Sequence, residues 1–268
     1  MEVLSNGEYL SIKWNVASKL VNEDIANFAA RNGNLVLLTS LRENSCPWSE
    51  RTCSEAAKHG QLDCLKYLHK TGCPWNRASV YRAAANGHLS CLKYLHEQGF
   101  QWDEQMCYWA AAKGQLKCLQ YLRREGCPWT HETCYIAAFN GHLGCLEYAH
   151  ENGCPWDSRT LIAAAFNGHL ECLQYIHKQG CRWDSRACHV AAINGHLECL
   201  KYLHREGCPW TWKTYRDTKN LPLEKQICLQ YLIDNGCHRN IIFDGYIWGT
   251  ILAVWIMFIY LVAKGSIC

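Results

Sequence analysis

The chain has 268 residues, a formal net charge of +3 and 19 cysteines. The small charge gives no reason to expect a nucleic acid or another acidic partner, and the length allows one or two domains. Residues 1–14 carry neither the basic region nor the apolar core of a secretory signal peptide. We therefore expect a cytosolic chain whose thiols are reduced, rather than a secreted disulfide framework.

We assign residues 1–23 to an N-terminal cap, and residues 24–236 to an array that repeats every 27 residues. Six copies, from about residue 46 to 207, are clear, with a looser copy before them and a stretched copy after them. One column of the repeat is glycine: Gly33, Gly60, Gly87, Gly114, Gly141, Gly168 and Gly195. Another is tryptophan: Trp48, Trp75, Trp102, Trp129, Trp156, Trp183 and Trp210.

Each repeat is predicted to fold as two short helices. A residue that can cap a helix follows every tryptophan. These residues are Ser49, Asn76, Asp103, Thr130, Asp157, Asp184 and Thr211. The first helix then runs about nine residues to the Gly60 column, and the second runs from about Leu62 to Lys70. One pair cannot bury its apolar face, whereas a stack can, so we predict an all-α fold, an α-solenoid of about eight helix pairs.

The repeat consensus A-A-x-N-G-H-L-E-C-L-K-Y-L-H-E-N-G resembles the ankyrin pattern A-A-x-x-G-H-x-x-V-V-x-x-L-L-x-x-G. Cys64 and Leu65 stand at the paired valines, and the resemblance covers roughly residues 24–236. The unit is shorter than the usual 33 residues or so. R-T-C-S also replaces the T-P-L-H signature. The resemblance implies a protein-binding scaffold with its projecting hairpins reduced to short loops, of a divergent type found in large DNA viruses and some protists.

Eighteen cysteines fall in three columns. The first contains Cys46, Cys73, Cys127, Cys154, Cys181, Cys208 and Cys237; the second contains Cys53, Cys107, Cys134 and Cys188; the third contains Cys64, Cys91, Cys118, Cys145, Cys172, Cys199 and Cys228. Neighbours within a column lie one layer apart, about 10 Å, which is too far for a disulfide. There is no C-x-x-C pair for zinc. Val80, Leu161 and Phe100 replace cysteines, so we expect small core residues and no metal or cofactor; metal and disulfide remain the alternatives.

Histidine follows the glycine in four repeats, at His88, His142, His169 and His196. By resemblance to ankyrin repeats, these histidines bond backbone groups in the turn between helices. Gln61 and Gln115 replace histidine in this column, and glutamine can also form such bonds. We expect the column to be structural rather than catalytic.

Positions that vary between copies are free of the constraints of the fold. By resemblance, the first helix of each repeat lines the concave face that ankyrin proteins use for partners. We predict a partner-binding surface there, and aromatic residues are enriched at the energetic centres of interfaces. Its residues are Tyr81, Arg82, Tyr108, Trp109, Tyr135, Phe139, Phe166 and His189. The alternative is that these rings fill gaps between layers.

The C-terminal part breaks the pattern. We assign residues 237–244 to a linker and residues 245–263 to a transmembrane helix. The eighteen-residue run Tyr246–Ala263 has one aliphatic polar residue, Thr250, and aromatic residues near both ends. This composition is typical of a single membrane span. The alternative is a capping helix that packs on the last repeat.

These features together predict a non-enzymatic scaffold for protein partners, held on the cytosolic face of a membrane, which is a host membrane if the source is viral. No phosphate-binding loop, serine-hydrolase motif or zinc-protease motif is present, so we expect no catalytic residues and no small-molecule substrate. The alternative is a soluble ankyrin-type adaptor, for example one that recruits a target to a ubiquitin ligase, whose tail docks on protein.

Overall fold

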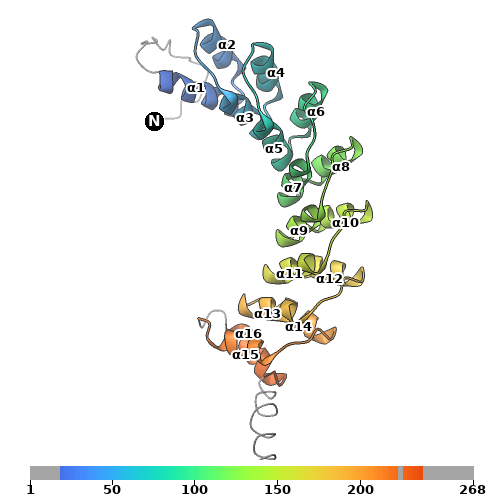
Figure 1. The fold of residues 1–268 in the computed structure, drawn as a ribbon. Helices are drawn as coiled ribbons and strands as arrows, with labels where there is room; N and C mark the ends of the chain where they lie inside the picture. Colours follow the sequence, from blue (N-terminus) through green and yellow to red (C-terminus); the bar gives the residue numbers. More distant parts are fainter. Residues whose placement is uncertain (1–18, 223–225, 238–268) are drawn as a thin grey trace, which may run out of the picture. The chain divides into compact units, whose positions relative to one another are not determined.

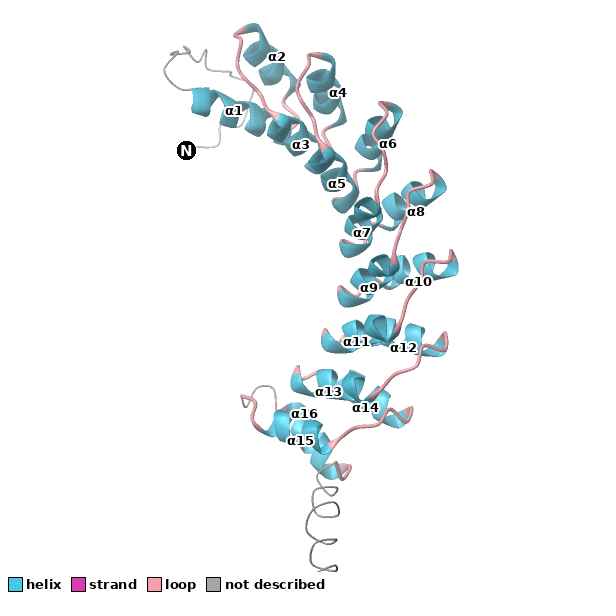
Figure 2. Ribbon diagram, viewed as in Figure 1, coloured by secondary structure: helices cyan, strands magenta, loops and turns pink. Residues whose placement is uncertain are grey.

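The computed structural model describes residues 19–222 and 226–237. This part of the chain contains sixteen helices and no strand (Figure 1, Figure 2). The predicted all-α fold of stacked helix pairs is confirmed. The described residues form two compact units, one up to Gln101 and the other from Trp102.

In the first unit, the first helices of the pairs are α1 (Lys19–Arg31), α3 (Glu50–Lys58) and α5 (Arg77–Ala85), and the second helices are α2 (Leu35–Glu43), α4 (Leu62–Lys70) and α6 (Leu89–Glu97). Within this unit, α3 packs between α1 and α5, and α4 packs between α2 and α6. The predicted lengths of nine residues are confirmed from α2 to α14, and α15 and α16 have eight residues each. Helix α1 runs across the predicted boundary at residue 23, and that boundary stays a prediction.

In the second unit, the first helices are α7 (Glu104–Ala112), α9 (His131–Phe139), α11 (Ser158–Phe166), α13 (Ser185–Ile193) and α15 (Trp212–Lys219), and the second helices are α8 (Leu116–Arg124), α10 (Leu143–Glu151), α12 (Leu170–Lys178), α14 (Leu197–Arg205) and α16 (Ile227–Asp234). Successive first helices lie side by side, and each also packs on the second helix of its own pair (Figure 1). The extra residues of the last repeat lie between α15 and α16.

The predicted helix starts are confirmed by the backbone at all seven capping positions, which is extended there. Five of the seven side chains accept a hydrogen bond from a backbone N–H of the following helix: Ser49, Asn76, Thr130, Asp157 and Asp184. The prediction is wrong for the side chains of Asp103 and Thr211, which make no such cap bond. At these two positions the extended backbone alone marks the helix start.

The turn between the two helices of a pair requires glycine. Gly168 has a φ of +77°, and a Cβ there would lie 2.4 Å from Nδ1 of His196, one repeat further along. The other ring nitrogen, Nε2 of His196, lies 2.9 Å from the carbonyl oxygen of Phe166. Gln61 replaces histidine and donates from Nε2 to the carbonyl oxygen of Arg31. The predicted backbone-bonding role of this column is therefore confirmed at these positions.

Alanine, leucine and cysteine fill the core. Ala56, Ala57, Leu65 and Leu68 are completely buried, and their equivalents recur in each full repeat. All eighteen cysteines in the described part are free, and every one except Cys181 is buried. Burial raises the pKa of several of these thiols, so they remain neutral at physiological pH. The prediction of small, buried core cysteines is confirmed for those seventeen.

Metal-binding clusters and membrane-spanning helices are both absent from residues 19–222 and 226–237, the described part of the chain. These residues contain no cluster of three or more histidine, cysteine or acidic side chains that could hold a metal ion. None of their helices is long and apolar enough to cross a bilayer. The predicted transmembrane helix, residues 245–263, lies outside the described residues, as does the predicted linker 237–244 beyond its first residue.

Neighbouring second helices are joined by a repeated stack of three side chains. The ring of His150 on α10 stacks on Trp156, with 3.7 Å between the ring centroids. Tyr175 on α12 meets Trp156 edge-on, and its hydroxyl oxygen lies 3.0 Å from Nδ1 of His150. The same histidine–tryptophan–tyrosine set occurs at His69, Trp75 and Tyr94, at His177, Trp183 and Tyr202, and at His204, Trp210 and Tyr231. The tryptophan therefore packs over the seam between repeats.

Arginine replaces the histidine of this stack in two repeats. The guanidinium carbon of Arg42 lies 4.9 Å from the ring centroid of Trp48, and that of Arg123 lies 4.3 Å from the ring centroid of Trp129. A guanidinium over an indole face makes a favourable cation–π contact. Tryptophan is thus the fixed member of the stack, and its flat partner varies.

Burial lowers the pKa of His69 and of His204. A histidine with a lower pKa in the folded chain binds more protons when unfolded, so the free energy of unfolding falls as the pH falls. We predict a loss of stability between pH 7.5 and pH 5.5, through and below the ordinary histidine pKa of about 6.5. Urea unfolding across this range measures it. The double variant His69→Gln/His204→Gln should show a shallower pH dependence, and an unchanged slope would contradict the assignment.

Candidate functional site

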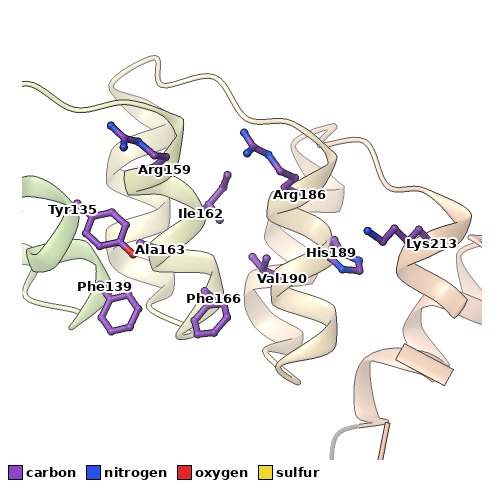
Figure 3. A pocket seen from close by; sticks show the side chains of 10 residues that line it. All are labelled: Tyr135, Phe139, Arg159, Ile162, Ala163, Phe166, Arg186, His189, Val190 and Lys213. Carbon is purple, nitrogen blue, oxygen red and sulfur yellow. The ribbon is translucent and has the colours of Figure 1, made fainter. Parts of the chain in front are cut away.

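The first helices of the second unit form a hollow of about 540 Å³. Four helices contribute to it: α9, α11, α13 and α15 (Figure 3). Its lining residues are Tyr135, Phe139, Arg159, Ile162, Ala163, Phe166, Arg186, His189, Val190 and Lys213.

The apolar wall follows from helical spacing. On α11, Leu161 and Ala165 are completely buried in the core, whereas Ile162 and Phe166, four residues apart, share the face turned to the hollow. On α9, Tyr135 and Phe139 have the same spacing, and their rings stack with 6.0 Å between centroids. Phe139 also stacks on Phe166 of the next repeat, at 6.3 Å. One row of aromatic rings therefore links two repeats.

Three cations lie along one rim of the hollow. Arg159, Arg186 and Lys213 are each the second residue of their helix, so they are 27 residues apart and recur once per layer (Figure 3). Arg159 donates from Nε and Nη2 to Asp157, at 2.8 and 2.7 Å. These hydrogen bonds lower the pKa of the Asp157 carboxyl, and Arg186 does the same for Asp184. Both pairs are exposed, so they stabilise the fold little.

His189 adds a titratable group to the floor of the hollow. Burial lowers its pKa, and Asp217, whose Oδ2 is 3.7 Å from Nε2 of His189, opposes that effect. Lys213 and Arg216 further favour the neutral ring. His189 is therefore a neutral hydrogen-bonding group at physiological pH.

The family model for ankyrin repeats (3 copies) matches residues 53–133 and again residues 134–214. The chain belongs to the ankyrin repeat family. Among solved structures, the human ASB11 ankyrin repeat domain is similar, with a TM-score of 0.55 and 20% sequence identity, over 66% of this chain and 96% of that one. At this identity the similarity shows the fold. No curated protein matches.

Ankyrin repeats support a scaffold for protein–protein interaction. The structure places four of the eight predicted partner-binding residues in the hollow: Tyr135, Phe139, Phe166 and His189. The other four lie elsewhere on first helices. Arg82 on α5 pairs with Glu55 at 2.7 Å, so its charge is already compensated within the first unit.

Tyr108 and Trp109 on α7 form an edge-on pair, with 5.4 Å between ring centroids. Trp109 is 38% exposed, and neither ring lines the hollow. Tyr81 on α5 is half-buried. Tyr81 therefore belongs to the first unit, whereas Tyr108 and Trp109 belong to the second. That these residues bind a partner stays a prediction.

Sequence reasoning missed the row of cations. Arg159, Arg186 and Lys213 occupy one column of the repeat, and the change from Glu132 to Arg159 within that column was the available signal. The sequence alone does not indicate a binding role for this column, because its members resemble ordinary charged residues at a solvent-exposed helix start.

We predict that Phe166 serves binding more than folding. Phe166 is 41% exposed, whereas Leu161 on the same helix is completely buried. Leu161→Ala should lower the free energy of unfolding by about 2–5 kcal/mol, and Phe166→Ala by about 1 kcal/mol or less. Urea unfolding of the two variants tests this. Equal losses would support the alternative in which the aromatic rings fill gaps between layers.

Proposed function

We propose that the hollow on α9, α11, α13 and α15 is the partner-binding site of this ankyrin array. Its occupant would be an extended protein segment that carries both apolar and acidic side chains. The observation that supports this is that an aromatic wall on α9 and α11 and a row of cations on α11, α13 and α15 line the same hollow and meet at α11.

The apolar wall suits the side chains of a peptide. Phe139 and Phe166 offer flat faces, and the smaller side chains of Ala163 and Val190 line the same hollow. Exposed aromatic rings and arginines are enriched among the residues that contribute most to binding energy. A volume of about 540 Å³ is within the range of ligand pockets and accommodates a few apolar side chains.

The cation row suits carboxylates at a fixed spacing. Packed helices lie about 10 Å apart, so the cations of successive layers repeat at about that distance. An extended chain rises about 3.3 Å per residue, so acidic residues three positions apart would match the row. Asp157 takes two of the five N–H donors of Arg159, which leaves three for a partner carboxylate.

Peptide display on the full chain, held in detergent micelles, tests this proposal. We expect selected peptides to combine an apolar residue with acidic residues three positions apart. Arg186→Gln/Lys213→Gln should weaken their binding about tenfold, which corresponds to about 1.4 kcal/mol. Arg205→Gln, an exposed arginine on α14 outside the hollow, is the matched control. Selected peptides without acidic bias, or with unchanged affinity for the double variant, would contradict the proposal.

We also propose that residues 245–263 anchor the array to the cytosolic face of a membrane. The support is the sequence, because an apolar run of this length is sufficient to cross the hydrocarbon core. The competing proposal is a soluble adaptor, for example for a ubiquitin ligase, in which the same run packs on a protein. The two proposals differ in whether the run contacts lipid.

Alkaline carbonate extraction of membranes from expressing cells separates the two proposals. We expect the chain to stay in the membrane pellet. Ile256→Arg should release it, because an arginine at the centre of a span costs about 2.5–3.5 kcal/mol on insertion. Ile227→Arg, at an exposed position of α16, is the control that should not. Release of the unaltered chain would rule out the anchor and favour the adaptor.

A further inference from the structure

Cysteines of the first and second columns meet in pairs within single repeats. One member lies in the first helix and the other lies twenty residues later, in the joint that leads to the next repeat. The pairs are Cys53 and Cys73, Cys107 and Cys127, Cys134 and Cys154, and Cys188 and Cys208. Neighbouring cysteines of one column lie a whole layer apart, so contacts between the first and second columns do not appear within any single column.

Three of the four pairs share one contact, from the thiol of the helix cysteine to the carbonyl oxygen of the joint cysteine. Sγ of Cys134 donates to the carbonyl oxygen of Cys154, at 3.8 Å. Cys154 also donates from Sγ to the carbonyl oxygen of Thr130, at 3.2 Å. The joint thiol is thus held against the first turn of its own first helix. The corresponding distances are 3.9 Å from Cys53 to Cys73 and 3.6 Å from Cys188 to Cys208.

In two of the four pairs, the two thiols are chemically unequal. The hydrogen bond from Cys134 lowers the pKa of Cys154, whereas the same bond and burial raise the pKa of Cys134. Cys208 and Cys188 differ in the same way. A thiolate is the nucleophile in thiol–disulfide exchange, so in these two pairs the joint cysteine is the member that reacts first.

The internal copies of the repeat show which residues stand at the two positions of the pair. Where Val80 replaces the helix cysteine, Phe100 replaces the joint cysteine. Where Leu161 replaces it, the joint keeps Cys181 but has arginine in place of proline, and Cys181 is the one incompletely buried cysteine of the described part. All four repeats with both cysteines have the sequence Cys-Pro-Trp in the joint. The joint cysteine is also kept at Cys46, where Ala26 stands at the helix position, so both cysteines are replaced together only in the repeat of Val80 and Phe100.

We propose that each pair is an oxidation site at which the two thiols form an intramolecular disulfide with a low-molecular-weight disulfide as oxidant. The Cys154 thiolate attacks one oxidant sulfur, forms a mixed disulfide and releases one small thiol. Cys134 then loses its proton and attacks Sγ of Cys154, which releases the second small thiol. The protein loses two electrons and two protons, and the oxidant is reduced to two thiols.

Access depends on local opening, because the paired thiols are almost completely buried. Each repeat of a solenoid contacts only its neighbours, so single repeats can open without unfolding the whole array. A bond between the first helix and the following joint would close a short loop and constrain the unfolded chain. Oxidation should therefore be slow in the native array and should stabilise it.

The experiment uses the full chain in detergent, reduced and then incubated with oxidised glutathione. Remaining thiols are alkylated, and the linked peptides are mapped by mass spectrometry. We expect disulfides within the four pairs, a mass loss of two hydrogens for each, and a higher midpoint of guanidinium unfolding. Cys181 and the third-column Cys172 should remain outside these links. Links distributed over all three columns, or four pairs that stay reduced, would overturn the proposal.

A gain-of-function variant sharpens the test. Leu161→Cys should supply the partner that Cys181 lacks, so an additional link between positions 161 and 181 should appear in the oxidised protein. Val80→Cys is the matched control, because its joint residue is Phe100 and no new link within that repeat can form. Absence of the 161–181 link in a variant that retains the helical circular dichroism of the parent would contradict the pairing geometry.

Discussion

The burial of an alanine pair on each first helix is the constraint on which the rest of the structure depends. Ala164 and Ala165 of α11 are completely buried, and the corresponding pairs on α9 and α13 are buried in the same way. Because alanine adds little bulk, successive first helices of a unit can pack side by side. Because of this packing, equivalent residues of successive repeats lie in a row on the surface. The cations of the hollow are spaced one layer apart for this reason, and the rings of Phe139 and Phe166 can stack.

In the joint between repeats, three residues impose a comparable constraint on the second helices. In the repeat that ends at Gly153, Cys154 points to the first helix, Pro155 prevents continuation of the helix, and Trp156 stacks on His150. One short segment therefore contacts both helices of its own repeat and the tyrosine of the next. The glycine that precedes it has a φ of +82°, which reverses the chain without a projecting hairpin. A 27-residue unit is sufficient because this joint replaces the longer ankyrin finger.

The sequence predicts repeated features, such as the period and the helix length, more reliably than it predicts contacts between side chains. The period, the nine-residue helices and the buried cysteines follow from composition and spacing alone, because each depends on local propensity or on burial of an apolar face. The contact of Cys134 with Cys154 depends on how the joint folds back on α9, and no column shows that. The stack of His150, Trp156 and Tyr175 escaped prediction for the same reason, although its members were visible as columns. Half of the predicted binding residues line the hollow because helical periodicity assigns a face, whereas the extent of the hollow depends on neighbouring side chains.

Selectivity in such an array must come from positions that the fold leaves free. The column that contains Arg159 reads Arg51, Ala78, Gln105, Glu132, Arg159, Arg186 and Lys213. Packing does not fix this column, since its residues lie in the first turn of the first helix with the charged groups in solvent. Its charge reverses between Glu132 and Arg159, where the row of cations begins. The aromatic wall belongs to α9 and α11, so the two features overlap only in the repeats around α11. A partner that needs both features can therefore bind in one register, although every repeat has the same backbone.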